Sequence, residues 1–211
     1  MKIALTFDDG PNHTTTLEVF ELLKKFHIKA TFFVIGNLID ESTSKIIRTI
    51  SEYGCDIENH SFSHSFMSHQ SREEIAEEVQ RTSDIIKTIT GKMPRFFRPP
   101  YIDLSAQMFE EIPLIFISGK GVEDWVDEVD ANERARRLLE TVEDGDIILL
   151  HDLEGNHKTV KALEQVLPIW IEQGHRFVTV SELFFEKEQT INAAKGILFQ
   201  NRNDSELWQP N

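Results

Sequence analysis

The sequence is poor in cysteine and in basic residues, and it has no long apolar run. Its 211 residues include one cysteine, Cys55, so no internal disulfide can form and a thiolate-rich zinc site is excluded. Lys and Arg number 22 against 36 Asp and Glu, and the resulting formal charge of -14 disfavours binding to nucleic acid or anionic lipid. Any metal site must therefore be built from His and carboxylate side chains.

The N-terminal segment lacks the features of a secretion signal. Met1 to Asp9 contain one lysine and two acidic residues, without the apolar core of a signal peptide. No uncharged stretch anywhere approaches the roughly 18 residues of a membrane helix. We therefore expect no membrane insertion and a cytoplasmic location, or a cell-wall or extracellular one if a leader has been removed.

Short β-branched and aromatic runs alternate with longer amphipathic segments, a pattern typical of an α/β domain. The expected strands are 2–8, 30–35, 56–59, 95–98, 114–118, 146–151 and 176–180. The expected helices are 14–26, 40–53, 72–90, 105–111, 132–143, 159–173 and 181–186. Seven such units indicate a barrel-like or doubly wound parallel sheet. Without a repeat or linker, we expect one domain, 1–186, and a C-terminal tail, 187–211, that docks on it or is partly ordered.

Polar side chains follow several of these strands. In parallel α/β domains, functional groups collect at the C-terminal ends of the strands. The groups found there are Asp8, Asp9, His60, His64, Arg98, Asp124 and His151. We expect them to meet at one rim of the sheet.

His60 and His64 lie four residues apart. On a helical turn, both imidazoles would point at one metal ion about 2.0–2.1 Å away. Asp8 or Asp9 would complete a two-histidine, one-carboxylate set with open positions, as in catalytic zinc sites. Because adjacent side chains diverge in an extended segment, one acid can bind the metal while the other faces its water. Taken singly, the histidines can also be a pair on a solvated helix, and the acids a turn with an N-cap.

Five ordered motifs resemble those of the NodB-type polysaccharide deacetylases, carbohydrate esterase family four. They are Thr6-Phe7-Asp8-Asp9-Gly10-Pro11, His60-Ser61-Phe62-Ser63-His64, Arg98-Pro99-Pro100-Tyr101, Asp124-Trp125 and Leu149-Leu150-His151. The resemblance implies a distorted (β/α)7 barrel, the NodB homology domain. It also implies hydrolysis of the N-acetyl group of N-acetylglucosamine units in a peptidoglycan-like or chitin-like poly- or oligosaccharide, which releases acetate and a free amine.

The resemblance also implies a role for each motif residue. Asp9, His60 and His64 would bind a divalent metal, usually zinc in the family, with cobalt, nickel or manganese as alternatives. Asp8 would act as general base, with Arg98 paired to it, and His151 as general acid, with Asp124 orienting its ring. The backbone N–H of Tyr101 would hold the oxyanion, and Pro99, Tyr101, Trp125 and Leu149 would contact the substrate.

Two positions depart from the family pattern. Ile102 follows Arg-Pro-Pro-Tyr where many relatives have glycine, and Gly119-Lys120-Gly121 occupy the stretch in which a further Asp often precedes Asp124. Both changes concern the substrate contacts and the oxyanion loop rather than the acid–base set. Two alternatives therefore stay open: hydrolysis of another C–N bond, such as that of a small cyclic amide, and sugar binding without turnover. The sequence does not indicate an oligomeric state.

Overall fold

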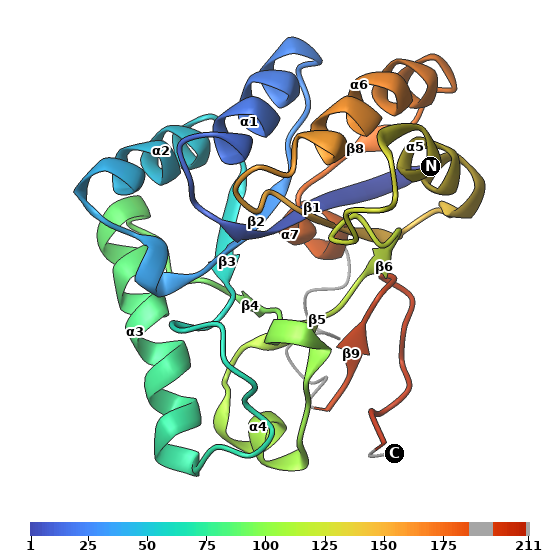
Figure 1. The fold of residues 1–211 in the computed structure, drawn as a ribbon. Helices are drawn as coiled ribbons and strands as arrows, with labels where there is room; N and C mark the ends of the chain where they lie inside the picture. Colours follow the sequence, from blue (N-terminus) through green and yellow to red (C-terminus); the bar gives the residue numbers. More distant parts are fainter. Residues whose placement is uncertain (186–195, 210–211) are drawn as a thin grey trace.

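A curled parallel sheet forms the centre of the molecule in the computed structural model, which describes residues 1–185 and 196–209 (Figure 1). Its strands are β1 (Lys2–Gly10), β2 (Thr31–Val34), β3 (Asp56–Asn59), β4 (Phe96–Phe97), β5 (Ile115–Ile117), β6 (Lys120–Gly121), β7 (Ile147–His151), β8 (Arg176–Phe177) and β9 (Leu198–Phe199). The strands run in the order β6-β7-β1-β2-β3-β4-β5-β9, and β8 pairs with β1. This barrel-like arrangement confirms the predicted fold class.

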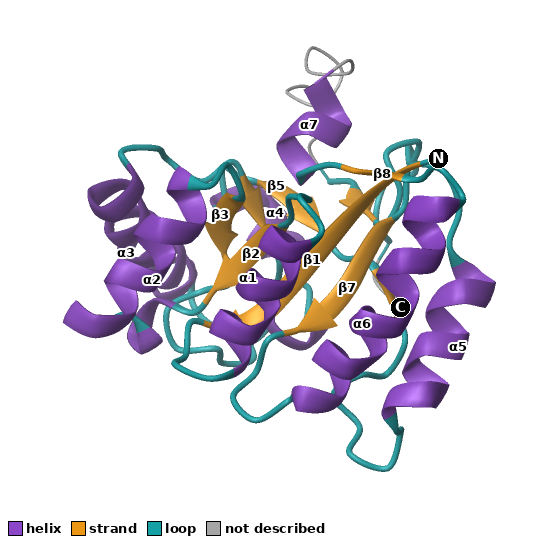
Figure 2. Cartoon of the chain, turned by 90° about the horizontal axis from the view of Figure 1, so that it is seen from above, coloured by secondary structure: helices purple, strands orange, loops and turns teal. Residues whose placement is uncertain are grey.

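Helices surround the sheet, and all of them except α7, which packs on its interior side, cover its outer face (Figure 2). They are α1 (Thr15–Lys25), α2 (Glu41–Glu52), α3 (Arg72–Thr90), α4 (Ala106–Glu111), α5 (Ala131–Thr141), α6 (His157–Glu172) and α7 (Val180–Phe184), with 3-10 turns at Gly36–Leu38 and Pro100–Ile102. Each of the seven predicted helices is present, although the predicted last residue, Glu186, lies outside the described residues. Among the helices of residues 1–185 and 196–209, none is long and apolar enough to cross a bilayer.

Successive side chains of β1 point alternately to the outer and the inner face of the sheet. Ile3, Leu5 and Phe7 pack outward against the helices in the main apolar cluster. Ala4 faces the other way, into a second cluster with residues of α7. Because side chains two apart in a strand share a face, Thr6 and Asp8 continue Ala4's side into the barrel. The interior therefore changes from apolar near α7 to polar at the end of β1.

The C-terminal segment closes the gap between the two ends of the sheet. Leu198 pairs with Phe116 of β5, and the N–H of Ile147 in β7 donates to the carbonyl of Gln200 at 2.9 Å. Phe199 is buried beside α7 in the interior cluster. Neither β6 nor β9 was predicted, because Lys120–Gly121 contains no apolar residue and Leu198–Phe199 lies in a tail of weak periodicity. The domain boundary expected at 186/187 lies outside the described residues.

Candidate active site

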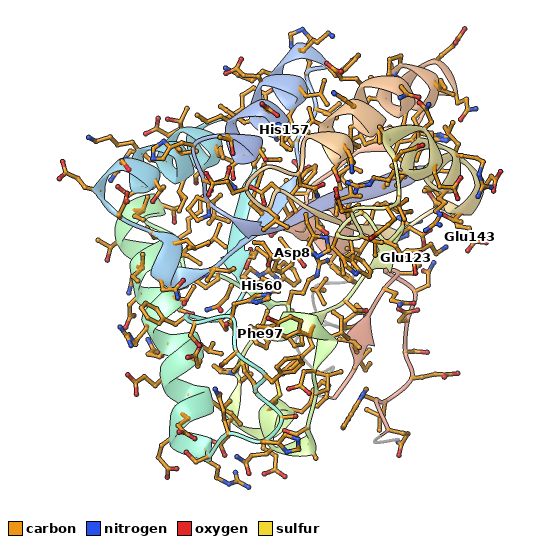
Figure 3. All side chains as sticks on the ribbon, in the orientation of Figure 1. Asp8, His60, Phe97, Glu123, Glu143 and His157 are labelled. Atoms are coloured by element: carbon orange, nitrogen blue, oxygen red, sulfur yellow. The ribbon has the colours of Figure 1, made fainter. Side chains whose placement is uncertain are left out.

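An open cavity of about 330 Å³ lies at the C-terminal ends of the strands. It is lined by nine of the eleven predicted site residues and by Ile102: Asp8, Asp9, His60, His64, Pro99, Tyr101, Trp125, Leu149 and His151. The other two, Arg98 and Asp124, are fully buried and hydrogen-bond Asp8 and His151 from behind. Figure 3 shows Asp8 and His60 close together at the centre of the molecule. The structure therefore brings all the predicted site residues together.

Asp9, His60 and His64 present one ligand atom each within 4.8 Å of one another. Asp9 Oδ1 lies 3.1 Å from His64 Nε2 and 3.4 Å from His60 Nε2. This buried oxygen has no hydrogen-bond partner in the structure, a costly condition that a metal ion would relieve. Burial raises the pKa of Asp9, but the two imidazoles lower it by a larger amount. The net result is a pKa below the usual range of an aspartate. The donor set therefore fits a divalent cation.

A β-bulge directs the two adjacent acids to different partners. The pairing of β1 with β2 shifts register between Asp8 and Gly10, and Asp9 adopts a left-handed backbone with φ 73°. The side chains diverge as expected, but the cause is this bulge and not regular alternation in an extended strand. Gly10 is required here because a Cβ at this position would overlap the carboxylate of Asp152.

The loop from His60 to His64 is not helical, so the predicted helical turn is wrong. Ser61 and His64 have positive φ angles of 66° and 57°, which break any helical path. The imidazoles still converge, with ring centroids 4.9 Å apart. The Nδ1–H of His60 donates to the carbonyl of Arg98 at 2.7 Å, which leaves Nε2 free for a metal.

Glu78 on α3 holds this loop in place. Its carboxylate accepts hydrogen bonds from the backbone N–H groups of Phe62 and Ser63 at 2.9 and 2.8 Å. Asn59 accepts from the N–H of Ser61 at 2.8 Å. Polar side chains thus replace helical hydrogen bonds as the support of the loop. Glu78 looks like any exposed helix residue in the sequence, so nothing there could have indicated its role.

Arg98 anchors Asp8 inside the barrel. Its guanidinium donates to Asp8 Oδ1 at 2.6 Å and to Thr6 Oγ1 at 2.7 Å, and it lies 4.2 Å from the ring of Phe33. A further hydrogen bond joins it to the carbonyl of Ser118. Burial lowers the pKa of Arg98, although Asp8 opposes this shift and an arginine stays protonated in proteins. The cation therefore fixes the direction of the Asp8 carboxylate.

His151, at the end of β7, is paired with Asp124. Asp124 accepts from the imidazole Nδ1 at 2.7 Å and from the backbone N–H of His151 at 2.8 Å. Burial lowers the pKa of His151, but the hydrogen bond and the charge of Asp124 outweigh it and raise that pKa to about 9. The imidazole is therefore protonated at neutral pH, with Nε2 able to donate.

Arg134, on α5, supports this pair from behind. It is 2% exposed and donates to Thr159 Oγ1 at 2.9 Å and Asn156 Oδ1 at 2.6 Å. Thr159 in turn donates to Asp124 Oδ2 at 2.8 Å. Arg134 also donates to the carbonyls of Val126 and Val129, in the loop that carries Asp124. Nothing in the sequence distinguishes Arg134 from the exposed Arg136 and the half-buried Arg137 beside it.

Tyr101 and Ile102 both adopt left-handed backbone conformations, with φ 58° and 52°. Such a φ is unfavourable for a β-branched side chain and costs about 1–2 kcal/mol. Within residues 1–185 and 196–209, five of the seven non-glycine residues with positive φ belong to this site: Asp9, Ser61, His64, Tyr101 and Ile102. Backbone strain is therefore concentrated where the ligands and the pocket wall are held.

The chain matches a known protein family and several of its members. The sequence profile described as polysaccharide deacetylase matches residues 1–112, more than half of the chain. A bifunctional xylanase/deacetylase from Pseudobutyrivibrio xylanivorans is 43% identical over 86% of this chain. The peptidoglycan-N-acetylglucosamine deacetylase PgdA of Listeria monocytogenes is 37% identical over 89%. The chain spans only 30% and 40% of the length of these two relatives.

A solved structure shares the fold over nearly its whole length. The family 4 acetyl xylan esterase from Clostridium thermocellum, in complex with a cobalt ion, aligns with a TM-score of 0.91 and 37% identity. The alignment covers 95% of this chain and 98% of that one. The motif order, the barrel and the profile match agree. This chain belongs to the polysaccharide deacetylase family.

Proposed function

We propose that this chain removes acetyl groups from an acetylated polysaccharide by metal-dependent hydrolysis. One observation carries the proposal: a single open cavity joins a three-ligand metal set to an acid paired with Arg98 and an imidazole paired with Asp124. These are the parts that hydrolysis of an acetyl group needs: a base for water, an acid for the leaving atom and a cation for the carbonyl. The family match supports the same reading.

Asp9, His60 and His64 would hold the metal, which we propose to be zinc. When bound, the ion would supply Lewis acidity toward water and toward the acetyl carbonyl. Two imidazoles and one carboxylate suit zinc, and also cobalt, which the Clostridium thermocellum esterase contains. Asp8 and His151 line the same cavity, within reach of an acetyl group bound there.

Asp8 would take the first proton. Its Oδ1 is engaged by Arg98, so Oδ2 is the free acceptor, and this oxygen lies 3.8 Å from His60 Nε2 on the metal side. The oxygen of an attacking water forms a bond to the acetyl carbon while its proton passes to Asp8. The N–H of Tyr101 would stabilise the oxyanion, since a fixed backbone donor needs no reorganisation.

His151 would supply the proton for the leaving atom. An amide nitrogen leaves poorly as an anion, and a protonated imidazole in the cavity removes this difficulty. The bond between the acetyl carbon and that nitrogen breaks as the proton arrives, and acetate and a free amine result. Pro99, Trp125 and Leu149 would surround the sugar and the acetyl methyl with apolar surface.

A second candidate changes only the leaving atom. The relative from Pseudobutyrivibrio is a xylanase/deacetylase and the Clostridium structure is an acetyl xylan esterase, so an O-acetyl ester of xylan is a further substrate to consider. An alkoxide leaves more readily than an amide anion, so the same acid and base suffice. The Listeria relative, by contrast, supports the N-acetyl substrate of the main proposal.

Acetate release tests the proposal. Purified chain with added zinc is incubated with chito-oligosaccharides, peptidoglycan, acetylated xylan and a small cyclic amide, and acetate is quantified enzymatically. We expect acetate from at least one polysaccharide and none after substitution of His60→Ala. Ring opening of the cyclic amide without acetate from any polysaccharide would contradict the proposal, and so would sugar binding by the zinc-loaded chain without turnover.

A further inference from the structure

Large aromatic side chains are exposed beside the cavity. Phe66 is 61% exposed, Tyr101 58% and Trp125 53%. Exposed apolar groups of this size that adjoin a pocket mark a binding surface. Tyr101 and Trp125 line the cavity itself, but Phe66 does not, and nothing in the mechanism above uses it.

Phe66 extends the aromatic wall of the site outward. Its ring stacks on Tyr101 with centroids 4.1 Å apart and an interplanar angle of 12°. Tyr101 in turn contacts the ring of His64, with centroids 4.6 Å apart at 63°. Two ring contacts therefore connect Phe66 to a proposed metal ligand, and the surface is continuous from the reacting centre to the rim.

The two loops that carry these rings are hydrogen-bonded to each other. The N–H of Ser68 donates to Asp103 Oδ2 at 2.7 Å and ties the loop after His64 to the loop after Tyr101. Met67, next to Phe66, is fully buried in the apolar cluster under α3 and α4. Phe66 is therefore exposed on an anchored backbone, as expected of a preformed binding surface.

The charges of these loops indicate the chemistry of the occupant. Residues 63–70 and 99–105 contain no Lys or Arg and one carboxylate, Asp103. An anionic ligand would meet no cation from either loop and would face a protein of charge -14. A flat apolar ring surface without a cation fits the carbon–hydrogen face of an uncharged sugar ring.

We propose that Phe66 and Tyr101 form a stacking platform for an uncharged sugar unit adjoining the acetylated unit in the same polysaccharide chain. The platform rests on the proposed function, which places the acetylated unit over Asp9, His60 and His64. It makes the enzyme prefer oligomers over single acetylated groups, because only an oligomer reaches Phe66 while its acetyl group reaches the metal site.

The test compares an oligomer with a minimal acetyl compound. The value of kcat/KM is measured on a neutral acetylated tetrasaccharide, of chito- or xylo-type as wild type prefers, and on 4-nitrophenyl acetate. For Phe66→Ala we expect the ratio of the two values to fall about 10-fold, with the loss in the KM of the tetrasaccharide. Phe66→Trp should restore the ratio.

Phe185 provides a matched control. It is a phenylalanine that is 74% exposed and follows α7, which packs against the opposite, N-terminal ends of the strands through Thr31 and Asp56. Phe185→Ala should leave the ratio unchanged. If wild type is active, an unchanged ratio in Phe66→Ala, or an equal loss of kcat/KM on both substrates, would refute the stacking role of Phe66. A wild type that releases no acetate from any polysaccharide would instead overturn the proposed function.

Discussion

Asp124 accepts two hydrogen bonds from one residue: the imidazole Nδ1–H of His151 at 2.7 Å and the backbone N–H of the same residue at 2.8 Å. The first fixes the tautomer and charge of the ring, and the second fixes the end of β7 that carries it. One carboxylate therefore controls both the position of His151 and its protonation.

Replacing Asp124 should shift the alkaline limit of activity. His151 must be protonated to act as an acid, so activity falls as the pH rises through its pKa, about 9 in the wild type. In Asp124→Asn the burial that lowers this pKa is opposed only by the charges of Asp8 and Asp9, and we expect the alkaline limb to move down by at least 1 pH unit. We also expect kcat/KM to fall about 100-fold or more.

The measurement is a pH profile of kcat/KM between pH 5 and 10. Asp127→Asn is the control, because Asp127 is an exposed acid of the same loop, paired with Lys158. An alkaline limb that stays in place in Asp124→Asn would show that His151 does not titrate as the acid.

Arg134 should act through the same pair. Replacing it by methionine keeps most of the volume but leaves Thr159 and Asn156 without their buried donor. We expect a loss of roughly 2–4 kcal/mol in the free energy of unfolding, measured in urea. Because the variant loses a cation that faces Asp124, we also expect an upward shift of the alkaline limb. Arg136→Met, an exposed neighbour on α5, should change neither. A loss of stability without a shift of the pH profile would show that Arg134 stabilises the fold but does not act on the pKa of His151.

Asp152 should make stability depend on pH. Burial raises its pKa from 3.8 to about 7, so the folded chain keeps a proton that the unfolded chain releases near pH 4. The free energy of unfolding contributed by this group therefore falls as the pH rises from about 4 to about 7. Asp152→Asn, which still accepts from Thr16, should flatten that slope in urea titrations at several pH values. A slope equal to that of wild type would contradict the assignment.

Ile102 should tolerate glycine unusually well. At its φ of 52°, an isoleucine costs about 1–2 kcal/mol, whereas the extra freedom of glycine in the unfolded chain costs about 0.4–1 kcal/mol. We expect Ile102→Gly to leave the free energy of unfolding equal or up to about 1 kcal/mol higher. Ile169→Gly, at a partly exposed position inside α6, should lower it by about 1 kcal/mol or more. A comparable loss in both variants would refute the strain at Ile102.

Local patterns in the sequence were enough to predict seven of the nine described strands, the helices and the meeting of the motif residues at one rim. The end of β1 illustrates the limit, because the bulge at Asp9 depends on a shift against β2 that no local pattern encodes. The loop from His60 to His64 depends in the same way on Glu78, and no local pattern in the sequence marks that residue as a support. The order of the motifs could thus be recognised in the sequence, whereas the β-bulge and the hydrogen bonds that position the motif residues could not.

The contacts that the sequence did not predict join residues far apart in the chain. Arg134 reaches Thr159 across 25 positions, and Gln200 accepts from Ile147 across the ends of the sheet. Phe66 is similar, since its stacking on Tyr101 joins two loops far apart in sequence. Such pairs become visible only when the barrel brings its elements together.

Substitutions at Asp8 and Asp9 separate the proposed base from the proposed metal ligand at two adjacent positions. Bound zinc per chain, measured after dialysis, is compared with acetate release for wild type, Asp9→Asn and Asp8→Asn. We expect wild type to bind one zinc and release acetate, Asp9→Asn to lose both, and Asp8→Asn to keep the zinc while losing at least 100-fold in acetate release. Full zinc binding by Asp9→Asn, or undiminished acetate release by Asp8→Asn, would refute these two roles.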